Sequence, residues 1–171
     1  PRYATGGFGY GGPCFPRDNV GHSFLGKHLG ASTELLEDND DYNRTISPRF
    51  VEKLKPYLRE GSTVAVLGLA YKPLSHVVEE SPGIYLCRTL AGKGLRVIGY
   101  DPLATEEARV ALQYHALVAD SLATCLQDAE CVLVITPDDI YKALKPNDFV
   151  GNKESVTVVD FWRCLDSSIR H

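Results

Sequence analysis

The stretch that decides the fold is residues 63–102, which read TVAVLGLAYKPLSHVVEESPGIYLCRTLAGKGLRVIGYDP. Its two ends, residues 63–69 and 95–100, are short apolar runs. Between them, residues 82–93 have the pattern of a helix whose first turn contains Pro82. Apolar strands that are connected through a helix are typical of a parallel sheet covered on both faces.

The same alternation continues to the end of the chain. Further strands are predicted at residues 131–136 and 155–161, and helices at residues 105–113, 121–127 and 137–144, while residues 115–118 can add one more strand. We therefore expect residues 61–171 to form an α/β domain with a doubly wound, Rossmann-like parallel sheet.

Upstream of Gly61 the pattern changes. The elements expected there are an irregular segment rich in glycine and proline at residues 1–18, a helix at residues 19–29 that ends before Gly30, and a helix at residues 33–58 that Pro48 can kink. The acidic residues of the second helix are interpreted as its solvated start: Glu34, Glu37, Asp38, Asp40 and Asp41. The α/β domain is thus preceded by a helical central segment, residues 1–60.

Composition and charge narrow the classes of function. The 171 residues carry a net charge of −4 and include 44% hydrophobic residues, a balance typical of a globular protein. Partners such as nucleic acid or an anionic membrane are not expected, because they require a basic excess. No apolar run approaches the ~20 residues that span a bilayer. The sequence contains no methionine, and we expect its first residue to be a cut rather than a natural start.

The five cysteines are scattered along the chain: Cys14, Cys87, Cys125, Cys131 and Cys164. They form no C-x-x-C pair and no metal-ligand spacing with the histidines, so no metal site is expected. An odd number of such cysteines in an acidic chain favours a reducing compartment, and a cytoplasmic location is expected. Cys87, Cys125 and Cys131 lie on apolar faces of predicted elements and are expected in the core.

A dinucleotide fingerprint is absent from the place where it would be expected. The first strand runs into Gly68, and the two further glycines of G-x-G-x-x-G are missing. Without them the backbone cannot approach a pyrophosphate closely, so this domain is not expected to be the main dinucleotide site. Asp101, which ends the next strand, is interpreted as a turn or capping aspartate before Pro102.

Cys14 lies in the segment GYGGPCFPRD, residues 9–18. The glycines expose backbone N–H groups that can hold phosphate oxygens. A helix that begins nearby, together with Arg17, would favour the thiolate form and suit a nucleophile. A structural cysteine in a tight loop is the alternative, and the residues alone leave both open. Lys72, just after a strand end, is likewise either an anion ligand or a solvated lysine.

Four segments occur in an order that resembles a known family: GFGYGGPCFPRD (residues 7–18), VAVLGLAYKP with ESP (64–73 and 80–82), VIGYDP (97–102) and VVDFWRCLD (158–166). Together they resemble the UDP-glucose/GDP-mannose 6-dehydrogenase family over nearly the whole chain. The first segment is similar to the catalytic loop of that family. The second is similar to the start of its C-terminal nucleotide-sugar-binding domain.

The resemblance implies an NAD-dependent enzyme that oxidises the C6 alcohol of a UDP- or GDP-linked sugar to a carboxylate. By motif position, Cys14 would be the nucleophile that forms a thiohemiacetal and then a thioester, and Asp18 would help to position water. Cys14 and Arg17 would also contact the cofactor. The residues that would bind the nucleotide-sugar are Gly7, Phe8, Gly9, Tyr10, Gly11, Tyr71, Lys72 and Arg163.

The resemblance also implies a division of labour. Residues 1–60 would supply the catalytic-thiol loop and, through the long central helix, a homodimer interface. Residues 61–171 would bind the nucleotide-sugar. Most of the NAD would be bound by a domain outside these 171 residues, so the isolated chain is not expected to complete the reaction.

Two departures from the family pattern bear on the substrate. Glu79 stands where the family often has an arginine, and a negative charge there would repel a pyrophosphate. Trp162 stands where the arginine of Asp-Gly-Arg is usual, with Arg163 one position later. One alternative is therefore a non-catalytic nucleotide-sugar-binding or dimerisation module of the same family. Another is a thiol-dependent acyl-transfer enzyme that pairs Cys14 with His22 or His28, although no recognisable His–Asn or His–Asp spacing supports it.

Overall fold

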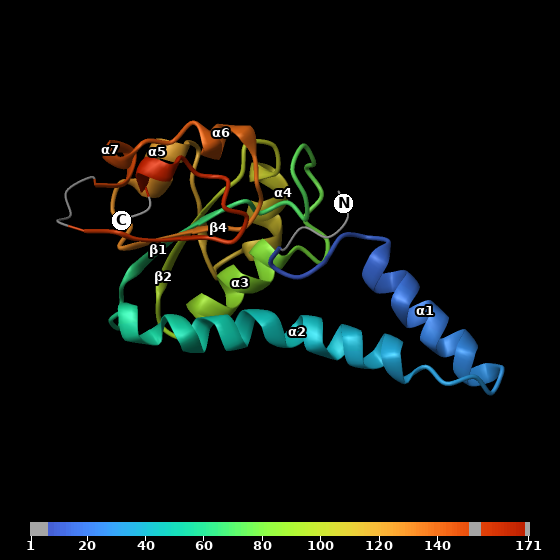
Figure 1. Ribbon diagram of the computed structural model, residues 1–171. Helices are drawn as coiled ribbons and strands as arrows, with labels where there is room; N and C mark the ends of the chain where they lie inside the picture. The colour runs from blue at the N-terminus through green and yellow to red at the C-terminus, as the bar shows by residue number, and fades with distance from the viewer. Residues whose placement is uncertain (1–6, 151–154, 170–171) are drawn as a thin grey trace.

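The computed structural model describes residues 7–150 and 155–169. The helices are α1 (Phe15–His28), α2 (Glu34–Leu54), α3 (Pro82–Ala91), α4 (Thr105–Leu112), α5 (Leu122–Leu126), α6 (Asp139–Lys142) and α7 (Pro146–Val150), and the strands are β1 (Thr63–Leu67), β2 (Arg96–Tyr100), β3 (Leu117–Val118), β4 (Cys131–Val134) and β5 (Thr157–Asp160). Two short 3-10 helices are η1 (Lys55–Tyr57) and η2 (Ser167–Ile169). The helices α1 and α2 form a hairpin that extends away from an α/β domain (Figure 1).

The five strands form one parallel sheet in the order β3-β2-β1-β4-β5. The central strand β1 pairs with β2 on one side and β4 on the other, so that Val64 lies opposite both Val97 and Cys131. The short pairing of β3 with β2 adds the strand that the sequence left open. The predicted parallel, Rossmann-like α/β fold is therefore confirmed.

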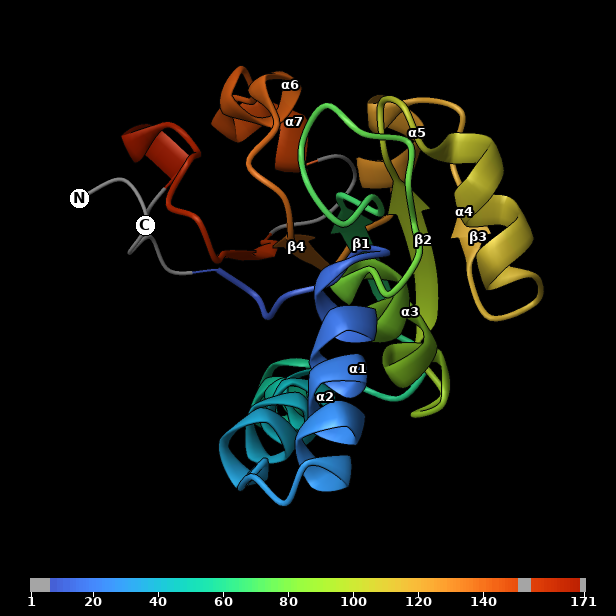
Figure 2. The same ribbon diagram turned by 90° about the vertical axis from the view of Figure 1, so that its right-hand side faces the viewer.

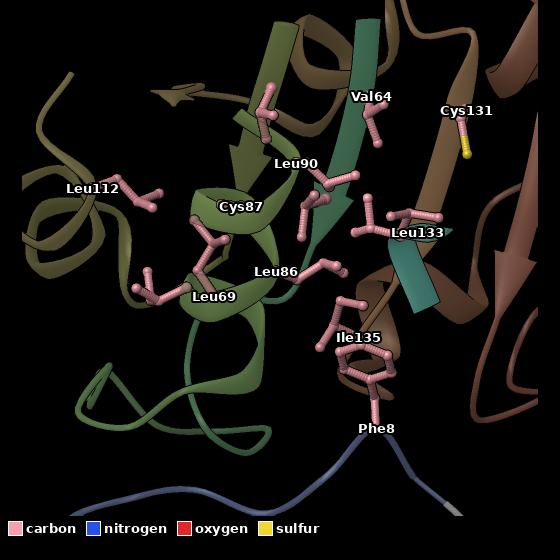
Figure 3. Close-up of a cluster of buried hydrophobic side chains, with 14 of the residues drawn as sticks. Phe8, Val64, Leu69, Leu86, Cys87, Leu90, Leu112, Cys131, Leu133 and Ile135 are labelled. Carbon is pink, nitrogen blue, oxygen red and sulfur yellow. The ribbon is translucent and has the colours of Figure 1, made fainter. Parts of the chain in front are cut away.

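Alternate residues of β1 enter two separate cores, as the period of two in a strand requires. Val64 and Val66 pack with side chains of α3, including Leu86 and Leu90, on one face of the sheet. Figure 3 shows this cluster, with Phe8 of the N-terminal segment at its edge. The intervening strand residues pack on the other face against α5, α6 and α7, where Tyr141 is fully buried.

The helical hairpin is attached to the domain through α2, which packs against α3 (Figure 2). The last turns of α2 place Val51 and Leu54 in the core beside α3. Between α1 and α2, the carboxylate of Glu37 accepts a hydrogen bond from Thr33 at 3.2 Å and also contacts Ser23 and Lys27. The hydrogen bonds from Lys27 and Ser23 lower the pKa of Glu37 below its ordinary value.

Several predicted element boundaries are wrong. Helix α1 begins at Phe15, inside the segment predicted to be irregular, because Pro16 occupies the first turn, where a missing N–H costs nothing. Helix α2 ends at Leu54 instead of continuing to residue 58. The chain then forms the short 3-10 helix η1, which contains Pro56. The helix predicted at residues 137–144 is limited to α6, and α7 was not predicted. Residues 1–6 of the predicted irregular segment lie outside the described residues.

Asp101 does more than cap a turn. Its carboxylate accepts hydrogen bonds from the backbone N–H groups of Leu103 at 3.0 Å and Ala104 at 2.9 Å, as the turn interpretation requires. It also accepts hydrogen bonds from the backbone N–H groups of Leu69 and Ala70, both at 2.9 Å, in the loop that follows β1. Asp101 is buried and therefore ties the loop after β1 to the loop after β2.

Candidate functional site

The segment that carries Cys14 lies against the loop that precedes α3. We call residues 7–14 the thiol loop. The N–H group of Gly12 donates to the backbone oxygen of Glu79 at 3.1 Å. A Cβ atom on Gly11 would lie 2.0 Å from the backbone oxygen of Glu80, so only glycine allows this approach. The backbone of residues 79–82 thus packs directly against the thiol loop. Glu79 contacts the loop through its backbone oxygen, whereas the sequence prediction concerned only its side-chain charge.

Tyr71 and Lys72 lie beside the same loop. A Cβ atom on Gly12 would come within 2.5 Å of the Tyr71 ring, so this ring covers the glycine directly. The Lys72 ammonium lies 5.3 Å from the centroid of the Tyr71 ring, and the Lys72 side chain is exposed. The structure therefore brings both residues of the predicted nucleotide contact to the carboxyl edge of the sheet, next to the thiol loop.

The end of β5 contacts the start of the thiol loop. The Trp162 ring lies against Gly7, where an added Cβ atom would be 2.9 Å from two ring carbons. The indole N–H of Trp162 donates to the backbone oxygen of Ile135 at 2.6 Å, which anchors the ring above the end of β4. Arg163, the next residue, is exposed and has a positive φ of 53°. Both departures from the family pattern, Glu79 and Trp162, are contacts of the thiol loop.

Phe8 is not available as a side-chain contact for a ligand. Its ring is only 4% exposed and packs at 4.5 Å from the centroid of Phe161 and 5.5 Å from that of Phe50. The three rings join the thiol loop, α2 and the end of β5 into one aromatic cluster. Phe8 therefore anchors the loop, and a predicted contact with substrate would have to involve its backbone.

On the side facing α2, the thiol loop meets polar residues that sequence reasoning missed. A cavity of about 30 Å³ is lined by Tyr10, Asp40, Asn43, Arg44, Glu80 and Tyr85, among others. Tyr85 donates to Glu80 at 2.9 Å, and Arg44 to Asp40 at 3.0 Å. The interpretation of Asp40 as a solvated helix residue is wrong, because its side chain is only 15% exposed and accepts the Tyr10 hydroxyl. The cavity has room for water but not for a nucleotide.

Cys14 is exposed and occupies the N-cap position of α1. Its backbone oxygen accepts the first helical hydrogen bond, from Asp18 at 2.7 Å. The Arg17 guanidinium pairs with the Asp18 carboxylate at 3.3 Å, and both groups are exposed. Cys14 is therefore an accessible thiol at the N-terminus of a 14-residue helix, a position that is compatible with a nucleophile.

The histidines of α1 do not form a Cys–His pair with Cys14. His22 lies eight residues along the helix and His28 fourteen, which corresponds to about 12 and 21 Å of helix rise. Hydrogen bonding between a nucleophile and its base requires about 3 Å. The acyl-transfer alternative therefore has no geometric support among these residues.

The other four cysteines are unlike Cys14. Cys87, Cys125 and Cys131 are fully buried in the two cores, as predicted. Burial raises the pKa of Cys125 and of Cys131 to about 12 and that of Cys87 further still. Cys164, which is half-buried beside Asp160, has its pKa raised to about 11, mainly by burial. These four thiols stay protonated at neutral pH, which leaves Cys14 as the exposed thiol of the chain.

The fold and site together define a class: a Rossmann-like α/β domain with a cysteine loop docked at the carboxyl edge of its sheet. Residues 65–167 match the UDP-binding domain of the UDP-glucose/GDP-mannose dehydrogenase family. This match covers more than half of the sequence, so the chain belongs to that family, as the four motifs predicted.

Individual relatives agree with the family assignment. The chain is 35% identical over 153 residues to the UDP-glucose 6-dehydrogenase AglM of Haloferax volcanii, covering 89% of this chain and 35% of that protein. It is 29% identical over 137 residues to TuaD, a UDP-glucose 6-dehydrogenase of Bacillus subtilis, covering 79% of this chain and 30% of the relative. The chain thus spans about a third of the length of these curated relatives.

Solved structures show the same fold. A UDP-glucose dehydrogenase from Pyrobaculum islandicum superposes with a TM-score of 0.78 at 30% identity, over 96% of this chain and 36% of that one. A GDP-mannose dehydrogenase from Pseudomonas aeruginosa also gives a TM-score of 0.78, at 21% identity, over 96% of this chain and 39% of that one.

Within residues 7–150 and 155–169, no helix is long and apolar enough to cross a membrane.

Proposed function

We propose that this chain is the C-terminal portion of an NAD-dependent nucleotide-sugar 6-dehydrogenase, with Cys14 as its nucleophile. The observation that carries the proposal is the docking of the thiol loop on residues 79–82, beside Tyr71 and Lys72. In open α/β sheets, ligands bind at the carboxyl ends of the strands. A nucleotide-sugar bound there would have its sugar next to the loop that carries the exposed thiol.

The proposed reaction oxidises the sugar C6 alcohol to a carboxylate in two two-electron steps, each of which would pass one hydride to a separate molecule of NAD. The contribution of this chain is the thiol. The Cys14 sulfur attacks the carbon of the intermediate aldehyde and gives a thiohemiacetal, whose oxidation gives a thioester that water hydrolyses. Cys14 is exposed at the N-terminus of α1, where its sulfur is accessible for the attack, and Asp18, in the first turn of the same helix, is proposed to position the water.

The described residues do not form a cradle for the NAD pyrophosphate. The backbone N–H groups of Leu69 and Ala70, which follow β1, already donate to Asp101. Helix α3 begins only at Pro82, and the Ser81 side chain caps its N-terminus by accepting from Gly83 at 3.2 Å. We therefore place most of the NAD contacts in a domain other than these 171 residues, with Cys14 and Arg17 as the proposed contacts from this chain.

We assign residues 1–60 to the catalytic loop and dimerisation helices and residues 61–171 to nucleotide-sugar binding. The second assignment is supported by the family match to residues 65–167. The proposed homodimer through the central helix α2 is supported by large apolar side chains that are exposed on α1, just after it and at the start of α2. Phe24 is 75% exposed, Leu29 72% and Leu35 82%. Such a concentration is typical of an interaction surface.

Thermal unfolding with added nucleotides tests the proposed binding. UDP at about 100 times its dissociation constant should raise the free energy of unfolding by about 2.7 kcal/mol. Replacing Lys72 by alanine should weaken UDP binding about tenfold, because an exposed ammonium contributes modestly to a diphosphate site. Lys93→Ala, which removes an exposed lysine paired with Glu52 near the opposite edge of the sheet, should bind UDP normally. The proposal fails when no uridine or guanosine nucleotide shifts the transition.

A further inference from the structure

The side-chain amide of Asn43, in α2, forms hydrogen bonds with both the N–H and the carbonyl group of Tyr10. Its Oδ1 atom accepts the Tyr10 N–H at 3.0 Å, and its Nδ2 group donates to the Tyr10 carbonyl at 3.0 Å. One side chain thereby replaces the two hydrogen bonds that a neighbouring strand would provide. A Cβ atom on Gly9, whose φ is 73°, would lie 2.7 Å from Asn43 Oδ1, so the loop also fits closely around the amide.

The side chain of Tyr10 is fixed to the same helix. Its hydroxyl donates to Asp40 at 3.2 Å and accepts from Asn39 at 3.3 Å. Arg44 in turn donates to Asp40 at 3.0 Å, which fixes the orientation of that carboxylate. Burial and the bond to Asp40 raise the pKa of Tyr10, so the phenol remains a donor at neutral pH.

These contacts hold the thiol loop at Tyr10, while residues 79–82 hold it at Gly11 and Gly12. Gly9 and Gly11, on either side of Tyr10, have no side chains, and Gly11 lies on the path from Tyr10 to Cys14. The cavity beside Asn43 is too small for a sugar, so the amide cannot act as a ligand from that side. Its effect must pass through the position of the loop.

We propose that Asn43 is a positioning residue that fixes the backbone of residues 9–11 in the arrangement that receives the sugar part of a bound nucleotide-sugar. This inference rests on the proposed function, because it takes the thiol loop as the sugar-binding element. A loop that is already held in its bound conformation loses less entropy when the ligand arrives. The uridine diphosphate part, which is proposed to contact Tyr71 and Lys72, does not depend on Asn43.

Calorimetric titration of the 171-residue chain with UDP and with UDP-glucose separates these two parts of the ligand. Asn43→Ala should weaken UDP-glucose binding about tenfold and leave UDP binding unchanged. Asn43→Asp, which keeps an acceptor for the Tyr10 N–H but loses the donor to its carbonyl, should give an intermediate loss. Thr45→Ala, on the same helix and exposed, is the matched control and should bind both ligands normally.

The outcomes distinguish the inference from the function on which it rests. When the unaltered chain binds neither ligand, the proposed function and the positioning role both fail. When the unaltered chain binds both, an equal loss of UDP and UDP-glucose in the Asn43 variants shows a general effect on folding and overturns the positioning role alone. Unchanged binding of UDP-glucose in Asn43→Ala and Asn43→Asp overturns it as well.

Discussion

Replacing Gly11 by alanine is expected to detach the thiol loop from residues 79–82. The added Cβ atom would lie 2.0 Å from the Glu80 backbone oxygen and 2.9 Å from its carbonyl carbon. Backbone atoms cannot move aside as the end of a flexible side chain can, so relief requires the loop to shift. Overpacking of this kind costs about 1–3 kcal/mol. The loop would therefore spend far more of its time open.

Hydrogen exchange of the Gly12 amide, followed by NMR, measures that opening. Because this amide bonds to the Glu79 oxygen in the docked loop, Gly11→Ala should accelerate its exchange about a hundredfold. Gly21→Ala provides the control, since a Cβ atom there meets nothing within 4 Å and alanine favours a helix. Continued protection of the Gly12 amide in Gly11→Ala would show that the loop does not dock as described.

Removing the Asp101 carboxylate is expected to cause the largest loss of stability. Asp101→Ala leaves four backbone N–H groups without their acceptor, those of Leu69, Ala70, Leu103 and Ala104. An unsatisfied buried donor costs about 1–3 kcal/mol, and water can reach some of the four, so the expected loss is about 3–5 kcal/mol. This is a large fraction of the stability of an ordinary domain.

Urea denaturation of the unaltered chain and of Asp101→Ala measures that loss of stability. The midpoint should fall for Asp101→Ala while the slope of the transition stays unchanged. Asp120→Ala removes an aspartate whose side chain is 91% exposed and which pairs with Arg109 at the surface, and should leave the midpoint nearly unchanged. Equal midpoints for Asp101→Ala and the unaltered chain would mean that the loops after β1 and β2 are not held through this carboxylate.

Local signals were enough to predict the sheet. The strands are continuous apolar runs, and their predicted positions contain the observed β1, β2, β4 and β5. The start of α1 was missed because glycine and proline before Cys14 suggested an irregular segment, although Pro16 is compatible with a first helical turn. Helix boundaries depend on such single positions, whereas strand positions depend on whole apolar runs.

The site could be predicted only in part. The thiol loop and Lys72 could be named as candidates because their residue types form a motif that can be read along the chain. Asn43 was missed because its partner, Tyr10, is 33 positions away, and a polar residue in a helix normally indicates a solvated face. Asp101 shows both cases, since its bonds to residues 103 and 104 follow from local turn geometry and those to residues 69 and 70 do not.

Protection of Cys14 by a nucleotide-sugar tests the central proposal most directly. The 171-residue chain is treated with iodoacetamide, and mass spectrometry follows the modification of each cysteine with and without saturating UDP-glucose. Cys14 should react fastest, because it is exposed and the other four thiols are buried or half-buried with raised pKa values. Those four are an internal control for unfolding.

The account predicts that UDP-glucose slows the alkylation of Cys14 by about tenfold or more, because the sugar would lie against the thiol loop and exclude the reagent. The rates of the buried cysteines should not rise. An unchanged rate at Cys14 under conditions in which UDP-glucose is bound would contradict the account, since the thiol would then lie away from the sugar it is proposed to attack.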